Sequence, residues 1–187
     1  MFAFEKVPGV KYKFNYPKIA EDLNALQRKG DKESNKEAVR IMREMVLADL
    51  FFLLYFVMGL TFLNNAFHVP RVYEVQKNEE NRNRLFGYLY LWAREHGKST
   101  IITKGLTIWE ILRDPEDTKA IVSYNRALAK SFLRGIKTEF EMNPLLKALF
   151  PDVLYANPEK EAIKWSEDDG MIVKRKSIVP ECTLAAW

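Results

Sequence analysis

The sequence has a single cysteine, Cys182, among its 187 residues, and therefore cannot form an internal disulfide bond. One cysteine is compatible with a reducing cytosol. The first residues, MFAFEKVPGVKYKF, contain no long apolar stretch and no small-residue cleavage site, so we expect no secretion signal. The sequence also has no internal repeat and no low-complexity segment.

An apolar run long enough to span a membrane is also missing. The run at residues 50–63, LFFLLYFVMGLTFL, falls short of the roughly 18–20 apolar residues that a membrane helix needs. Asp49 and Asn64 flank this run closely. We therefore expect residues 50–63 to form a buried helix and not a membrane span.

The overall composition is that of a globular protein. The chain is 48% hydrophobic and 29% charged, which excludes a disordered protein. Its net charge is +4, with an isoelectric point near 9.0. This balance is compatible with a polyanionic partner such as a nucleic acid, but many proteins with no such partner share it.

The N-terminal third of the sequence indicates helices. Residues 1–17 contain Pro8, Gly9 and Pro17 and are expected to be irregular. From Lys18 to about Met45 the chain is charged and helix-prone, with a break near RKGDKESNKE. Asp31 or Ser34 could cap the second helix of this pair. We expect residues 1–66 to be a helical appendage.

After residue 86 the pattern alternates between strand and helix. GYLYLWA, residues 87–93, is short, apolar and aromatic, which predicts a buried strand. STIITKGLTIWEILRD predicts a helix that ends at Asp114-Pro115. KAIVSYN, residues 119–125, predicts a second buried strand. RALAKSFLRGIKTEFEMN predicts an amphipathic helix with Leu128, Phe132, Ile136 and Phe140 spaced by four. Strand, helix, strand, helix is typical of a parallel α/β layer.

The C-terminal residues predict an antiparallel hairpin. Asp169-Gly170 is a strong turn signal, and a further strand is expected to begin near Cys182. Glu167, Asp168 and Asp169 are three consecutive acidic residues, which could in principle bind a magnesium ion. However, no apolar run precedes them, so we interpret them as turn residues.

The stretch LWAREHGKST, residues 91–100, contains the strongest functional motif. In a phosphate-binding loop, backbone N–H groups at the start of a helix point at the phosphates. A lysine reaches the β- and γ-phosphates, and the next hydroxyl binds Mg²⁺. Gly97, Lys98 and Ser99 fit these three positions, between a predicted strand and a predicted helix. The alternative is a helix capped by Ser99 beside a solvated lysine.

One loop residue departs from the ordinary motif, and two others have side chains that could contact a phosphate. Trp92 stands where the first glycine of such a loop is expected, and should reshape the start of the loop. Arg94 lies inside the loop, where a guanidinium could stabilise charge on a transferring phosphoryl group, or could be an ordinary surface arginine. His96, one of two histidines, could contact a phosphate or could be structural.

The segment LYLWAREHGKSTIIT resembles the deviant phosphate-binding loop of the large terminase subunits of tailed bacteriophages, in which the first glycine is commonly lost. The similarity continues through ILRDPEDTKAIVSYNRALAKSFLRGIKTEFEMNPLLKALFPDVL and KWSEDDGMIVKRKS, and covers roughly residues 45–187. It implies an α/β fold: an incomplete, RecA-like P-loop ATPase core of the additional-strand class in residues 67–187, after the helical appendage.

The resemblance also implies site residues and cofactors. The loop residues Arg94, Glu95, His96, Gly97, Lys98, Ser99 and Thr100 would bind ATP. Among them, Lys98 would bind the phosphates, Ser99 would bind Mg²⁺, and Arg94 would be the catalytic arginine. Gln76, in FHVPRVYEVQ, is the candidate for the adenine-contacting glutamine of the family, although it could be an ordinary surface residue.

By the same resemblance, the chain would be the N-terminal part of a motor that couples ATP hydrolysis to DNA translocation into proheads. Its partners would be double-stranded DNA, the portal protein and the small terminase subunit, in the host cytoplasm, with a homo-oligomer possible in the full motor. The acidic motif that activates water and the nuclease domain are missing from the sequence, so we expect this chain to be poorly active alone. The alternatives are another P-loop NTPase, such as a helicase or kinase, or a non-catalytic module that binds nucleotide or a partner.

Overall fold

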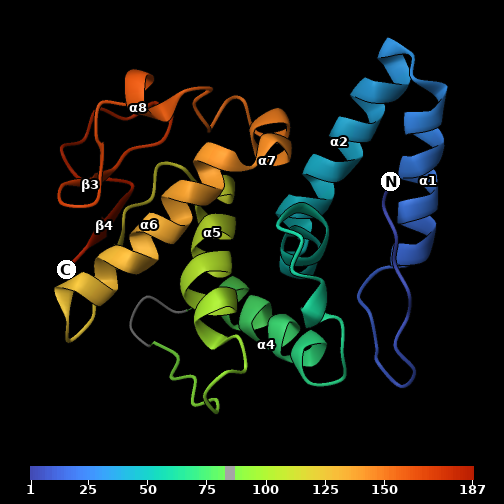
Figure 1. Cartoon of the computed structure of the whole chain (residues 1–187), viewed down its shortest axis with the longest axis horizontal. Coiled ribbons are helices and arrows are strands. Elements are labelled where there is room, and N and C mark those ends of the chain that lie inside the picture. Colours follow the sequence, from blue (N-terminus) through green and yellow to red (C-terminus); the bar gives the residue numbers. More distant parts are fainter. Residues whose placement is uncertain (83–86) are drawn as a thin grey trace. The chain divides into compact units, whose positions relative to one another are not determined.

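The computed structural model describes residues 1–82 and 87–187, and these ranges are mostly helical with one small mixed sheet (Figure 1). The chain divides into two compact units, residues 1–96 and residues 97–187. The boundary between the units falls at the peptide that joins His96 to Gly97, inside the candidate phosphate-binding loop. The domain boundary expected after residue 66 stays a prediction.

The first unit is built from helices. They are α1 (Tyr16–Lys29), α2 (Lys32–Ala48), α3 (Leu50–Phe52), the π-helical turn η1 (Leu53–Val57), the 3₁₀ turn η2 (Thr61–Leu63) and α4 (His68–Glu80). Gly30 ends α1 in the left-handed conformation, with a φ of 66°. The Asp31 side chain then accepts a hydrogen bond from the Ser34 N–H and caps α2, as one of the two predicted caps. Figure 1 shows α1 and α2 as a helical hairpin.

The apolar run at residues 50–63 is helical and buried at its start, as predicted, but it is not one helix. It comprises α3, η1 and η2, and Gly59 with a φ of 70° separates the last two. Leu50, Phe51 and Phe52 are fully buried. The rings of Phe4, Tyr16 and Tyr55 pack around Phe51, so the irregular N-terminal residues complete this core. None of the helices in the described ranges has the length and apolar character that a membrane crossing requires.

The second unit combines helices with the sheet. Its elements are η3 (Ser99–Leu106), which is π-helical and runs into α5 (Thr107–Arg113), then β1 (Lys119–Ile121), α6 (Arg126–Met142), α7 (Pro144–Leu149), α8 (Pro158–Glu161), β2 (Trp165–Ser166), β3 (Gly170–Met171) and β4 (Leu184–Ala186). The strand order is β1-β4-β3-β2. β1 is parallel to β4, and the other two pairs are antiparallel.

Several predictions for this unit are confirmed. The helix after Gly97 ends at Arg113, and β2 and β3 form the hairpin around Asp169-Gly170. The second predicted strand is confirmed only in part, because β1 is shorter than predicted, and Val122 and Tyr124 after it are 76% and 95% exposed. α6 is amphipathic, but its buried face comprises Ala129, Leu133, Ile136 and Phe140. Leu128, predicted on the same stripe, is 39% exposed. A strict spacing of four drifts around a helix of 3.6 residues per turn, which explains this difference.

The strand predicted at residues 87–93 is wrong, because these residues form no strand in the structure. Leu89 and Leu91 are 83% and 82% exposed, in place of the expected burial. A strand needs a neighbour that takes its backbone hydrogen bonds. Here side chains make the contacts instead: Asn78 of α4 donates a hydrogen bond to the Tyr90 hydroxyl. The described structure therefore lacks the first strand of the predicted strand-helix-strand-helix alternation, and it shows one small mixed sheet in place of the P-loop core that we expected.

Candidate functional site

The candidate loop is a tight turn that leads directly into a helix. Glu95 and Gly97 both have a φ of 66°, in the left-handed region, which is uncommon for a residue such as glutamate. The Gly97 carbonyl accepts a hydrogen bond from the Ile101 N–H, at 2.9 Å. Lys98 has helical backbone angles and immediately precedes η3. The sequence therefore positions Lys98, Ser99 and Thr100 in the first turn of a helix, as predicted.

The first turn of this helix has the properties that an anion site uses. The first N–H groups of a helix lack intrahelical acceptors, and the helix dipole gives them a partial positive charge. Lys98 is half-buried and Ser99 is exposed. Within residues 1–82 and 87–187, no carboxylate forms an ion pair with Lys98. The turn thus offers backbone donors, an ammonium group and a hydroxyl, which are the groups that bind a phosphate.

Trp92 is accommodated by packing outside the turn. Its indole lies edge-on to the Phe67 ring, with centroids 6.3 Å apart, and edge-on to Tyr90 at the same separation. Arg94 is exposed, and its carbonyl accepts a hydrogen bond of 2.8 Å from Nδ1 of His96. The residue at the first-glycine position therefore does not occupy the turn between Arg94 and Gly97.

The turn is attached to the start of α4, which the sequence analysis did not anticipate. Nε2 of His68 lies 3.1 Å from the His96 carbonyl oxygen. The His96 ring also packs against Phe67, with centroids 4.8 Å apart. The signal that could have indicated this arrangement is Asn65 three residues before His68, a spacing that lets an asparagine cap a helix and contact the histidine.

Gln76 is buried, and both donor positions of its amide are used within the first unit. Oε1 accepts a hydrogen bond from the Leu50 N–H at 3.0 Å. Nε2 donates to the Ala48 carbonyl at 2.9 Å and to Oε1 of Glu80 at 2.7 Å. This glutamine fastens α4 to the junction between α2 and α3. Adenine contact by Gln76 stays a prediction: a contact in which Nε2 donates to the base requires one of its two hydrogen bonds to be exchanged.

The acidic residues of the hairpin are turn residues, as predicted, and two of them, Glu167 and Asp168, pair with cations of α6. Arg134 forms two hydrogen bonds of 2.6 Å with the Glu167 carboxylate, and holds the pKa of Glu167 below its usual value. The Lys130 ammonium contacts Asp168 and lowers the pKa of that carboxyl as well. In the described part of the chain, no group of three or more histidine, cysteine, aspartate or glutamate side chains is placed to hold a metal ion.

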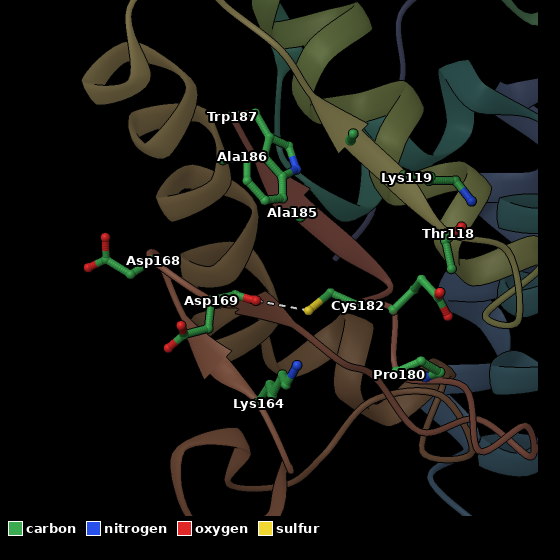
Figure 2. A pocket seen from close by; sticks show the side chains of 12 residues that line it. Thr118, Lys119, Lys164, Asp168, Asp169, Pro180, Cys182, Ala185, Ala186 and Trp187 are labelled. Atoms are coloured by element: carbon green, nitrogen blue, oxygen red, sulfur yellow. Dashed lines mark hydrogen bonds between the residues drawn. The ribbon is translucent and has the colours of Figure 1, made fainter.

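A cavity of about 500 Å³ in the second unit contains none of the predicted site residues (Figure 2). It is lined by β1, β4, the turn of the hairpin and the segment before Cys182. The Cys182 thiol donates a hydrogen bond of 2.9 Å to the Asp169 carbonyl across this region. The sequence could not indicate this cavity, because it depends on the pairing of β1 with a strand far along the chain.

A scan against protein-family models, a search of curated proteins and a search of solved structures each found no match to this chain.

Proposed function

We propose that this chain binds Mg-ATP through residues 94–100 and is the N-terminal part of a bacteriophage DNA-packaging motor, a large terminase subunit. The observation that carries the nucleotide proposal is the backbone of the loop. Gly97 adopts a φ of 66°, and Lys98, Ser99 and Thr100 follow at the start of a helix. This geometry supports a phosphate-binding role even though the ordinary first glycine is replaced by Trp92.

In this proposal each loop residue has a chemical role. Lys98 neutralises the β- and γ-phosphates, and the Ser99 hydroxyl is a ligand of Mg²⁺. Glu95, His96, Gly97 and Thr100 contribute the other ATP contacts of the loop in this proposal. The exposed guanidinium of Arg94 stabilises the charge that develops on the γ-phosphoryl group during transfer, so Arg94 is the proposed catalytic residue.

The wider proposal concerns the motor to which this chain would belong. ATP hydrolysis would drive double-stranded DNA into a prohead, with the portal protein and the small terminase subunit as partners, in the host cytoplasm. The net charge of +4 is compatible with a DNA partner but does not require one. This part of the proposal rests on the resemblance of residues 45–187 to large terminase subunits.

A second candidate function, nucleotide binding without turnover, is favoured by the placement of the acidic side chains. Glu167 and Asp168 already form ion pairs with Arg134 and Lys130 of α6. The described residues provide Ser99 for Mg²⁺ but no acidic cluster beside which water could be activated. This chain alone would then bind ATP and release little product.

A titration with a fluorescent ATP analogue in the presence of Mg²⁺ tests nucleotide binding by the loop. Lys98→Ala should abolish binding, because Lys98 is the cation assigned to the phosphates. Lys160→Ala is the matched control, since Lys160 is an exposed lysine of α8 and has no role in the proposal. Equal affinities for the wild type and Lys98→Ala would refute the assignment of the loop.

A further inference from the structure

We infer that His68 is a positioning residue for the phosphate-binding turn, acting through a hydrogen bond from its Nε2–H to the carbonyl of His96. The inference rests on the proposed nucleotide-binding function of residues 94–100. The two atoms lie 3.1 Å apart, and both belong to the first unit. A carbonyl oxygen only accepts hydrogen bonds, so this contact requires that Nε2 carries the proton.

The orientation of Asn65 independently requires the same protonation state of His68. Oδ1 of Asn65 accepts hydrogen bonds of 2.9 Å from the N–H groups of Phe67 and His68, at the start of α4. Its Nδ2 donates to the Phe62 carbonyl at 2.8 Å, which prevents the amide from turning over. Nδ2 also lies 2.7 Å from Nδ1 of His68. Because Nδ2 is a donor, Nδ1 of His68 must be an unprotonated acceptor.

The hydrogen bond from His68 orients a peptide group of the turn. In a trans peptide, the carbonyl of one residue and the N–H of the next point in opposite directions. The His96 carbonyl accepts the hydrogen bond from His68, so this bond constrains the orientation of the peptide group that joins His96 to Gly97. Nδ1 of His96 likewise donates a hydrogen bond to the Arg94 carbonyl, and this bond constrains the orientation of the peptide group that carries the Glu95 N–H. Two N–H groups of the turn are therefore directed by side chains of histidine.

Phe67 supports this arrangement from the neighbouring position. Its ring contacts both the His96 ring, at 4.8 Å, and the Trp92 indole, at 6.3 Å. The start of α4 thus holds the turn by one hydrogen bond and by aromatic packing. Phe67 and His68 thereby hold residues on both sides of Arg94 and Glu95, including Trp92 at the position of the ordinary first glycine.

The functional test compares variants of His68 in the titration with the fluorescent ATP analogue. His68→Leu should lower the affinity about fivefold, the loss expected for one hydrogen bond. His68→Gln should stay within about twofold of wild type, because the glutamine amide offers a donor in the position of Nε2. Phe62→Leu is the matched control. The centroid of the Phe62 ring lies 5.8 Å from that of His68, but Phe62 has no part in the proposed hydrogen bond between His68 and His96. Unchanged affinity in His68→Leu, when Lys98→Ala is impaired, refutes the role of His68 and leaves the loop assignment standing.

A nuclear magnetic resonance measurement tests the inference even if nucleotide binding fails. The side-chain ¹⁵N shifts of His68 should show a neutral ring protonated at Nε2. The Gly97 amide resonance should move in His68→Leu and stay near its wild-type position in Phe62→Leu. If Lys98→Ala binds nucleotide as well as the wild type, the proposed function is refuted. The His68 side-chain shifts and the Gly97 amide resonance then still test the role of His68. Protonation at Nδ1, or an unmoved Gly97 resonance, overturns the inference.

Discussion

The Tyr16 hydroxyl donates a hydrogen bond of 2.5 Å to Oδ2 of Asp49, at a site where both side chains are fully buried. The Asp49 carboxylate also accepts from the N–H groups of Phe51 and Phe52, and so it caps α3. The Tyr73 hydroxyl lies 2.8 Å from that of Tyr16. One buried carboxylate thereby connects α1, α4 and the junction between α2 and α3.

The stability of the first unit should fall as the pH rises through the titration of Asp49. Burial raises the pKa of Asp49 from 3.8 to about 6, against the opposing effects of the Tyr16 hydrogen bond and of the Lys13 charge. At a pH between these two pKa values, the Asp49 carboxyl keeps its proton in the native state and has lost it in the unfolded state. The unfolded state then binds fewer protons, so the free energy of unfolding decreases with rising pH, by an amount on the order of 2–3 kcal/mol.

Urea denaturation of the wild type and of Asp49→Asn, from pH 4 to pH 7, measures this effect. The difference in unfolding free energy between the two proteins should change across the window, because the other titrating groups are common to both and cancel. Two profiles that run parallel from pH 4 to pH 7 would show that Asp49 has an ordinary pKa in the folded protein.

Gly170→Ala should destabilise the second unit by about 2–4 kcal/mol, since it combines backbone strain with a steric overlap. Gly170 has a φ of 86°, and a Cβ there would lie 2.6 Å from the Leu184 carbonyl and 3.0 Å from Sγ of Cys182. Gly135→Ala is the matched control, because a Cβ on this glycine of α6 would meet nothing within 4 Å. Alanine there should be neutral or slightly stabilising. Thermal denaturation of both variants measures the difference, and similar losses in the two would contradict the close contact of β3 with β4.

The isolated chain should bind Mg-ATP but hydrolyse it hardly at all. Glu167 and Asp168 of the hairpin are paired with α6, and the described residues offer no acidic cluster that could hold a metal ion. A phosphate-release assay at saturating ATP measures turnover, with Lys98→Ala as the background control. Release at about 1 s⁻¹ or faster would reveal a catalytic carboxylate that this interpretation overlooks, and Glu95 and Asp168 would be examined first.

Local patterns in the sequence predicted the elements that depend on local physics. Asp31 caps α2 through its own side chain, and Gly170 with Asp169 forms the turn of the hairpin, so neighbouring residues are sufficient to specify both. The amphipathic pattern likewise predicted α6. Element type and boundary follow in these cases from capping, turn chemistry and periodicity.

Long-range contacts explain what the sequence could not predict. Residues 87–93 have strand-forming side chains, but strand formation depends on a partner, and the described residues pair none with them. The burial of Gln76 depends on contacts with Ala48 and Leu50, and the position of His96 depends on His68. Such pairings between distant residues leave no periodic pattern in the sequence. Gly97, Lys98 and Ser99 could be placed at the start of a helix because that feature is local.

The most direct test of nucleotide binding by the loop is a titration of Mg-ATP into the ¹⁵N-labelled protein, followed by backbone amide resonances. We predict saturable shifts centred on Gly97, Lys98, Ser99 and Thr100, with the same resonances unmoved by Mg-ATP in Lys98→Ala. Shifts that instead centre on the cavity beside Thr118, Cys182 and Trp187, or no saturable shift at any residue, would contradict the proposed function.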